Sequence, residues 1–94
     1  MTYKLGFFKS ALKEWRKLAP PIREQFKKKL IKRLEHPHVP TARLSGANAN
    51  RYKIKLRNLG YRLVYQIEED EVIILVVAVG KRENDAVYQA AEKR

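Results

Sequence analysis

The sequence predicts an α+β fold: a helical hairpin and a C-terminal helix on a largely antiparallel four-stranded sheet, in the order β-α-α-β-β-β-α. Three patterns support this. Apolar residues recur every fourth position from Ile22 to Leu34, alternate with cations over Tyr52–Arg57, and run almost unbroken over Val72–Val79. These patterns are typical of an amphipathic helix, a half-buried strand and a central strand buried on both faces. The 94 residues have room for a single domain, residues 1–94.

The N-terminal half contains the first strand and the helical hairpin. Tyr3–Phe8 predicts a short strand, and helical spacing of apolar residues begins near Ser10. Pro20 and Pro21 end this first helix, and a proline is also well placed at the start of the next one. The second helix continues to the His36-Pro37 pair, which ends it.

The C-terminal half contains two hairpins and a last helix. Residues 38–50 predict a loop, and Asn58–Gly60 predicts the turn between the strand Tyr52–Arg57 and a second strand, Tyr61–Ile67. The acidic run Glu68–Glu71 marks the next turn, where such charges are usually only solvated.

The last strand and helix follow that acidic turn. We expect Gly80 to end the buried strand. Asn84 or Asp85 then caps a helix that runs to Glu92.

The charge balance points to a polyanionic partner. Lys and Arg number 21 against 10 Asp and Glu, a formal net charge of +11. Nucleic acid is the first candidate partner, an acidic protein the second and an anionic membrane the third. The chain has no cysteine, which fits a reducing cytoplasm. The charged N-terminus is neither a signal peptide nor a membrane span, so we expect no membrane association.

A cationic surface on the predicted sheet is the candidate for catalysis. Lys53 and Lys55 leave the same face of their strand, Arg62 follows across a tight turn, and Arg82 and Tyr88 come after the buried strand. Fixed cations stabilise the negative phosphorane formed when RNA is cleaved. A lysine among other cations has a lowered pKa and is then a plausible base, and a tyrosine can stack on a base. The competing interpretation is an ordinary solvent-facing strand.

A second basic region surrounds the predicted long helix. Its cations are expected on the outward faces of the helix, where RNA backbone would offset their mutual repulsion; a merely solvated helix face is the alternative. The full set of expected RNA-binding residues is Arg23, Lys27, Lys28, Lys29, Lys32, Arg33, Arg57 and Lys81.

Other kinds of site find little support in the sequence. His36 and His38 flank a proline and are expected to be turn residues, so a histidine-based nuclease or a metal site is not predicted. No phosphate-binding loop, dinucleotide fingerprint or nucleophile elbow is present, and no cofactor is expected.

The chain resembles the RelE family of ribosome-dependent mRNA interferase toxins. The resemblance runs in order through nearly the whole chain, in the segments ALKEWRKL, REQFKKKL, YKIKLR followed by GYRLVYQ, and VGKRE with Tyr88. It implies cleavage of the mRNA codon in the ribosomal A site. The family's catalytic lysines match Lys53 and Lys55, with Lys55 as general base. Its transition-state arginines match Arg62 and Arg82, the latter also as acid, and its stacking tyrosine matches Tyr88.

The resemblance also implies partners. The basic helices would lie against ribosomal RNA. An acidic-tailed RelB-like antitoxin would wrap the toxin, displace its last helix and repress the shared operon, which links the toxin indirectly to operator DNA. One departure is Ser45-Gly46, where the family often carries an arginine before the glycine.

Two other functions fit the same scaffold. A ParE-like toxin inhibits DNA gyrase by binding rather than by catalysis, but such proteins generally lack the cationic strand set that is present here. An inactive module that binds RNA or sequesters an antitoxin is the third possibility.

Overall fold

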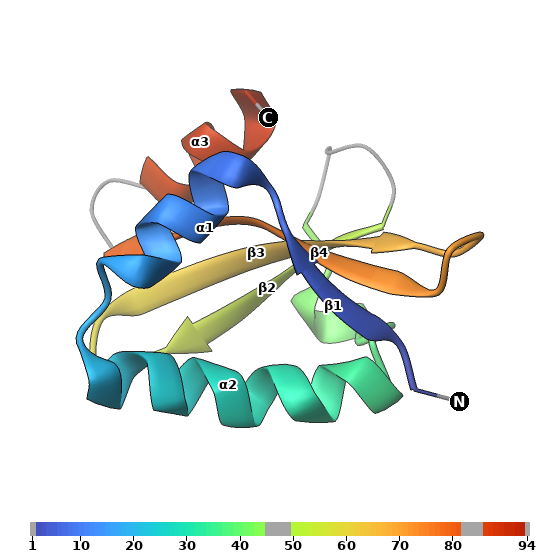
Figure 1. Cartoon of the computed structure of the whole chain (residues 1–94), viewed down its shortest axis with the longest axis horizontal. Coiled ribbons are helices and arrows are strands. Elements are labelled where there is room, and N and C mark those ends of the chain that lie inside the picture. Colours follow the sequence, from blue (N-terminus) through green and yellow to red (C-terminus); the bar gives the residue numbers. More distant parts are fainter. Residues whose placement is uncertain (1, 45–49, 82–85, 94) are drawn as a thin grey trace.

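The computed structural model describes residues 2–44, 50–81 and 86–93. The elements follow the predicted order, with one added 3-10 turn (Figure 1). They are β1 (Lys4–Phe7), α1 (Lys9–Arg16), α2 (Pro20–Glu35), η1 (Pro40–Ala42), β2 (Arg51–Leu56), β3 (Tyr61–Glu68), β4 (Ile73–Lys81) and α3 (Ala86–Lys93).

The four strands form one sheet in the order β1-β4-β3-β2. The β2–β3 and β3–β4 pairs are antiparallel, and β1 pairs with β4 in parallel. The α+β fold with a largely antiparallel sheet is therefore confirmed. Because β1 is short, α1 covers β4 where β1 has ended, and a Glu14 carboxylate oxygen accepts a hydrogen bond from the Val79 N–H at 3.3 Å.

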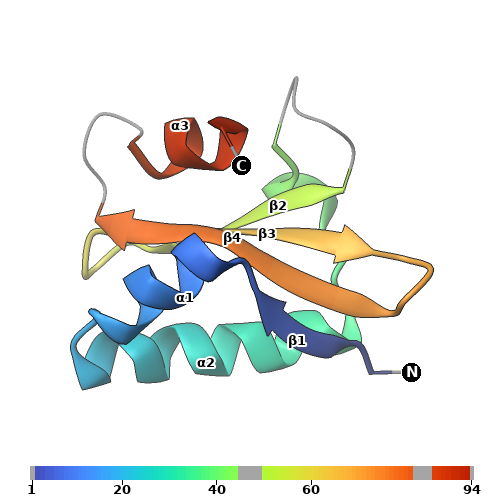
Figure 2. The ribbon, with the colours of Figure 1, turned by 45° about the horizontal axis from the view of Figure 1, so that its top comes forward.

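Both faces of the sheet are covered by helices (Figure 2). The larger core lies on the α1 and α2 side, where Phe26 and Leu30 of α2 meet Ile54 and Leu63 of the sheet. The smaller core lies under α3 on the opposite side of the sheet. A register shift in the β3–β4 pairing at Val64/Tyr65 accompanies this core, to which the adjacent β4 residues Val77 and Ala78 both belong.

Most boundaries differ from the predictions by one or two residues, and two of these differences lie close to the candidate site. β2 begins at Arg51 rather than Tyr52, and β4 does not end at Gly80. Gly80 pairs with Arg62, and Lys81 pairs with Tyr61, so the ladder with β3 carries the strand beyond the glycine. The predicted caps of α3, Asn84 and Asp85, lie outside the described residues.

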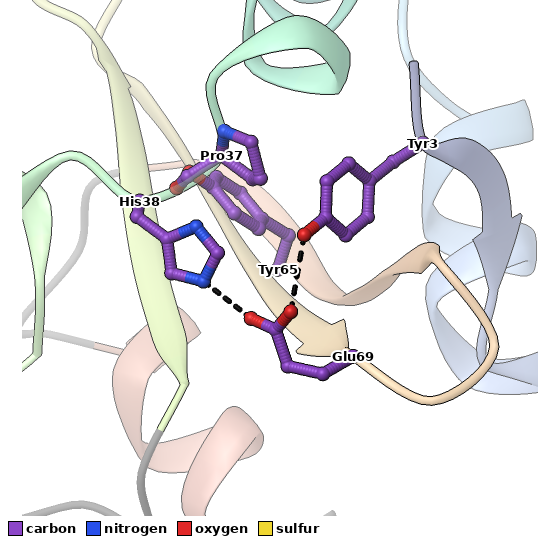
Figure 3. Close-up of polar contacts among 5 residues, drawn as sticks. All are labelled: Tyr3, Pro37, His38, Tyr65 and Glu69. Carbon is purple, nitrogen blue, oxygen red and sulfur yellow. Dashed lines mark hydrogen bonds and ion pairs between the residues drawn. The ribbon is translucent and has the colours of Figure 1, made fainter. Parts of the chain in front are cut away.

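The acidic turn has a structural role that the sequence reading did not assign to it. Glu69 accepts a hydrogen bond from the Tyr3 hydroxyl at 3.1 Å and forms an ion pair with His38 when that histidine is protonated (Figure 3). Desolvation and the Glu69 carboxylate together raise the pKa of Tyr3. His38 is therefore a residue that links its loop to the turn, and Glu69 is not merely solvated.

Arg33 also differs from its prediction, because it faces the sheet rather than solvent. Its Nη1 donates to the Tyr65 hydroxyl at 2.9 Å, and its guanidinium lies 5.7 Å from the centre of the Tyr65 ring. The Tyr65 hydroxyl in turn donates to the Pro37 carbonyl at 2.7 Å. This chain of bonds ties the C-terminal end of α2 to the middle of the sheet. Within the described residues, no helix is long and apolar enough to span a membrane.

Replacing Tyr65 with phenylalanine should destabilise the protein and change the pH dependence of its stability. The loss of two buried hydrogen bonds should lower the free energy of unfolding by about 1–3 kcal/mol at neutral pH. Burial raises the pKa of Tyr65 in the folded protein above its ordinary value of 10.0. As the pH rises past 10.0, the hydroxyl therefore loses its proton in the unfolded chain before it does so in the folded protein, and the stability that this residue contributes is lost. The difference in the free energy of unfolding between the wild type and Tyr65→Phe should therefore become smaller above that pH.

Urea unfolding on both sides of pH 10.0 measures this difference. Tyr61→Phe, a half-buried position at the start of the same strand, serves as the control and should change stability by less than about 0.5 kcal/mol. A deficit of Tyr65→Phe that is equal at all pH values would contradict the predicted role of the buried hydroxyl.

Candidate active site

The turn between β2 and β3 positions the candidate catalytic side chains. The Leu56 carbonyl accepts the N–H of Leu59 at 3.1 Å and that of Gly60 at 2.8 Å. Gly60 has φ +70°, a left-handed conformation that other residues adopt at a cost. The resulting register places Lys55 directly opposite Arg62.

Lys53, Lys55 and Arg62 project from the face of the sheet that carries α3. Lys53 pairs with Val64, a residue of the core under α3, and side chains two apart share a face. Since Lys55 pairs with Arg62, these cations lie on that same face. Helix α3 packs on β4 and β3, and Lys53 and Lys55 on the neighbouring edge strand remain half-buried. The register thus places Lys53 and Lys55 on one face, as the alternation predicts, and adds Arg62 to that face.

Tyr88 and Arg62 are brought together by the packing of α3. The Arg62 guanidinium carbon lies 5.0 Å from the centre of the Tyr88 ring, a cation–π contact. Arg62 is only 9% exposed, so this contact takes place in a largely desolvated setting. The aromatic ring expected at the edge of the cationic surface is thus seated on one of its cations.

A hollow of about 290 Å³ opens beside these residues. Its lining comes from the end of β2 and the turn after it, with Lys55, Leu56 and Arg57, and from the end of that turn and the start of β3, with Gly60, Tyr61 and Arg62. A phosphate in this hollow would meet cations from both strands of the hairpin. Cations fixed in advance are suited to stabilise the charge that develops on a phosphorane.

Arg82, the remaining predicted catalytic residue, lies outside the described residues, as do Ser45 and Gly46. Lys81 is the last residue of β4 and is exposed, opposite Tyr61. Arg57 is exposed in the β2–β3 turn and borders the hollow.

The cations of α2 differ in their exposure and contacts. Four of them are exposed as predicted: Lys27, Lys28, Lys29 and Lys32. Arg23 is half-buried and lines a separate hollow of about 250 Å³ together with Trp15. Arg33 is half-buried and donates to the Lys53 carbonyl at the outer edge of β2 at 3.4 Å. The exposed Lys29 donates to the Lys55 carbonyl on the same edge, also at 3.4 Å.

Arg51 is a residue of this region that the sequence reading missed. It is 8% exposed, its Nε donates to the Gln66 side chain at 3.0 Å, and its Nη1 donates to the Ala91 carbonyl in the last turn of α3. A cation at the C-terminal end of a helix satisfies carbonyls that lack partners within the helix. Arg51 therefore fixes α3 to the strand that carries Lys53 and Lys55. Its place two residues before Lys53 is the signal that extends the cationic alternation back to it.

The chain is similar to known proteins over its full length. Residues 7–86 match the family described as the ParE toxin of the type II toxin-antitoxin system parDE. The mRNA interferase toxin RelE of Escherichia coli strain K12 is 52% identical over 94 residues, which covers 100% of this chain and 98% of that protein. The mRNA interferase RelE of Shigella flexneri matches with the same identity and coverage.

Solved structures agree with these matches. A double arginine-to-alanine variant of E. coli RelE in the free state superposes with a TM-score of 0.91 at 51% identity, over 100% of this chain and 98% of that one. RelE in the intact E. coli RelBE toxin-antitoxin complex gives a TM-score of 0.82 at 51% identity, over 87% of this chain and 99% of that one. The chain belongs to the RelE/ParE family of toxins of type II toxin-antitoxin systems, and within that family it is a RelE-type protein.

Proposed function

We propose that this chain is an mRNA interferase, a toxin that cuts the codon in the ribosomal A site and so stops translation. Support comes from the named activity of relatives that are 52% identical over the full chain. The observation that carries the proposal is the constellation of Lys55, Arg62 and Tyr88, which the hairpin register and the packing of α3 bring together.

The proposed reaction is an attack within the RNA strand. Lys55, as a neutral amine, takes the proton of a 2′-hydroxyl, whose oxygen then bonds to the adjacent phosphorus. The phosphorane gains negative charge, which Lys53 and Arg62 stabilise. The bond to the 5′-oxygen breaks, and this oxygen takes a proton, for which Arg82 is the expected donor. The products are a 2′,3′-cyclic phosphate and a free 5′-hydroxyl.

Tyr88 is proposed to hold the nucleotide in place. Its ring already contacts Arg62 at 5.0 Å and is half-buried, so its orientation is constrained before RNA binds. The part of the ring that remains exposed is suited to stack on an unpaired base. Stacking there would hold the adjacent phosphate over Lys55 and Arg62, which lowers the entropic cost of reaching the reactive geometry.

The proposed partners are the ribosome, its mRNA and an antitoxin. The exposed lysines of α2, with Arg57 and Lys81, offer contacts for ribosomal RNA phosphates, and such contacts weaken with salt. Solved complexes of E. coli RelE contain the antitoxin RelB or a peptide of it. We propose a RelB-like acidic antitoxin for this chain, operator DNA as its indirect partner, and the cytoplasm as the compartment where toxin and ribosome meet.

Inhibition of DNA gyrase, expected of a ParE-like toxin, is the alternative, since residues 7–86 match a family described by the name ParE. Arg82→Ala separates the two functions because a toxin that acts only by binding has no need of a group that protonates a leaving oxygen. If the chain is a nuclease, Arg82→Ala should lower its cleavage rate by at least about a hundredfold. Expression of this variant in growing cells should then be much less toxic than expression of the wild type. A folded Arg82→Ala protein that remains fully toxic would contradict the proposed site.

Cleavage itself should depend on Lys55 and on the ribosome. Purified protein should cut a defined mRNA in the A-site codon of a programmed ribosome and leave free mRNA largely intact, as mapped by primer extension. Lys55→Met should lower the single-turnover rate by at least about a hundredfold, because the proposed base is lost. The rate of the wild type should rise with pH as the amine loses its proton, and this rise should vanish in Lys55→Met.

Lys4→Met is the matched control, since Lys4 is exposed on β1 at the opposite edge of the sheet. It should retain wild-type cleavage. A Lys55→Met protein with an unchanged rate and pH profile would remove Lys55 as the base.

Arg51 should act as a positioning residue through α3. In Arg51→Met, α3 loses its bond to β2, so local opening of the helix should become easier by about 1–3 kcal/mol, measured as faster amide hydrogen exchange over 86–93. The rate of cleavage at saturating ribosome should fall less than in Lys55→Met, since the reacting groups remain, and Arg51→Lys should restore part of it. Unchanged exchange in α3 would show that Arg51 does not hold the helix.

A further inference from the structure

A second and larger hollow lies on the other side of the β2 edge. It has a volume of about 480 Å³ and is lined by Gln25 and Lys29 of α2 and by the run Lys55–Leu59 at the end of β2 and its turn. This volume falls within the roughly 300–1,000 Å³ typical of pockets that bind small molecules. Lys29 and Arg57 belong to the RNA-binding residues expected from the sequence, whereas Gln25, Asn58 and Leu59 of this lining do not.

The lining has the chemistry of a nucleotide site. Lys29 lines the hollow and donates to the Lys55 carbonyl at 3.4 Å, which places its charge beside the hollow. The amides of Gln25 and Asn58 each offer a donor and an acceptor, the combination that pairs with a base edge. Leu59 is 45% exposed, so it offers an apolar surface on this wall for contact with a flat base.

The two hollows are neighbours. Both are lined by Lys55, Leu56 and Arg57, so the end of β2 forms a wall common to the pair. A single RNA strand that crosses this wall would have one phosphate beside Lys55 and Arg62 and the adjoining nucleotide on the α2 side. Such a path needs an unpaired strand, because only splayed nucleotides expose their base edges.

We infer that the hollow between α2 and the β2–β3 turn binds the base of an RNA nucleotide next to the cleaved bond, with Gln25 and Asn58 contacting its edge. The inference rests on the proposed cleavage of RNA. It gives the chain its own contribution to the choice of codon, made by residues that take no part in the chemistry. A protein segment is the less favoured occupant, since cations, amides and an exposed leucine together match a nucleotide better.

The test asks whether the effect of removing one base of the message depends on the amides of Gln25 and Asn58. Programmed ribosomes carry messages in which a single base beside the cut site is removed, one position at a time, and single-turnover cleavage is measured. In the wild type, removal of the base that occupies the hollow should slow cleavage about tenfold. In Gln25→Ala/Asn58→Ala, cleavage of the intact message should be slowed to a similar extent, and removal of that base should have no further effect.

Two controls accompany the variant. Gln25 and Asn58 are both exposed, so the double variant should unfold at the wild-type temperature. Gln89→Ala, an exposed amide on α3 at the other face of the sheet, should keep the full penalty for base removal.

The outcomes separate this inference from the proposed function. If the wild type cleaves and no base removal near the cut site matters, or if the penalty is the same in the double variant, the hollow does not bind the base and only this inference is wrong. If the wild type leaves every message intact on the ribosome, the proposed function is wrong and this inference falls with it.

Discussion

Between Leu56 and Tyr61 the chain reverses through a turn that Gly60 completes at φ +70°, and the contents of both faces of the sheet follow from the register that this turn sets. Successive side chains of a strand point to opposite faces of the sheet. A shift of the β2–β3 register by one residue would therefore turn Lys53 and Lys55 into the core beside α2 and expose the apolar residues between them. An unpaired charge buried in this way costs several kcal/mol. The turn and the apolar alternation therefore act together: the same register that fills the core aligns the cations under α3.

That alignment carries a cost in repulsion, which the site accommodates in specific ways. Like charges directly opposite each other on neighbouring strands are destabilising, and Lys55 faces Arg62 in this manner. The Tyr88 ring lies 5.0 Å from the Arg62 guanidinium and offers its negative face to the cation. On the other side Arg62 pairs with Gly80, which brings no side chain of its own against it. A bound phosphate would relieve the remaining repulsion, so the arrangement is better suited to an RNA complex than to the free protein.

Much of this arrangement could be predicted from the sequence because it depends on local periodicity. The alternation over Tyr52–Arg57 was sufficient to place Lys53 and Lys55 on one face, and the short turn indicated that Arg62 lies near them; the register then pairs Arg62 with Lys55. The misassigned residues depend on contacts between distant segments: Arg33 turns inward because the Tyr65 hydroxyl is buried beneath it, and Glu69 is bound because the chain brings Tyr3 and His38 beside its turn. No window of neighbouring residues contains such partners. The sequence also predicts Arg82 for the site, but that prediction still awaits its test.

Strand β2 lies at the edge of the sheet, and the basic helix α2 has two roles beside it. An exposed edge presents unpaired carbonyls that invite pairing with another chain, and Arg33 and Lys29 occupy those of Lys53 and Lys55. Part of the positive charge of α2 thus protects the fold, while the lysines of the helix, Lys27, Lys28, Lys29 and Lys32, remain exposed. Each cation that contacts a phosphate steepens the salt dependence of binding by about one counterion. Arg33 should therefore contribute less to that dependence than the exposed lysines of α2, because its guanidinium is already bound to the Tyr65 hydroxyl and the edge of β2.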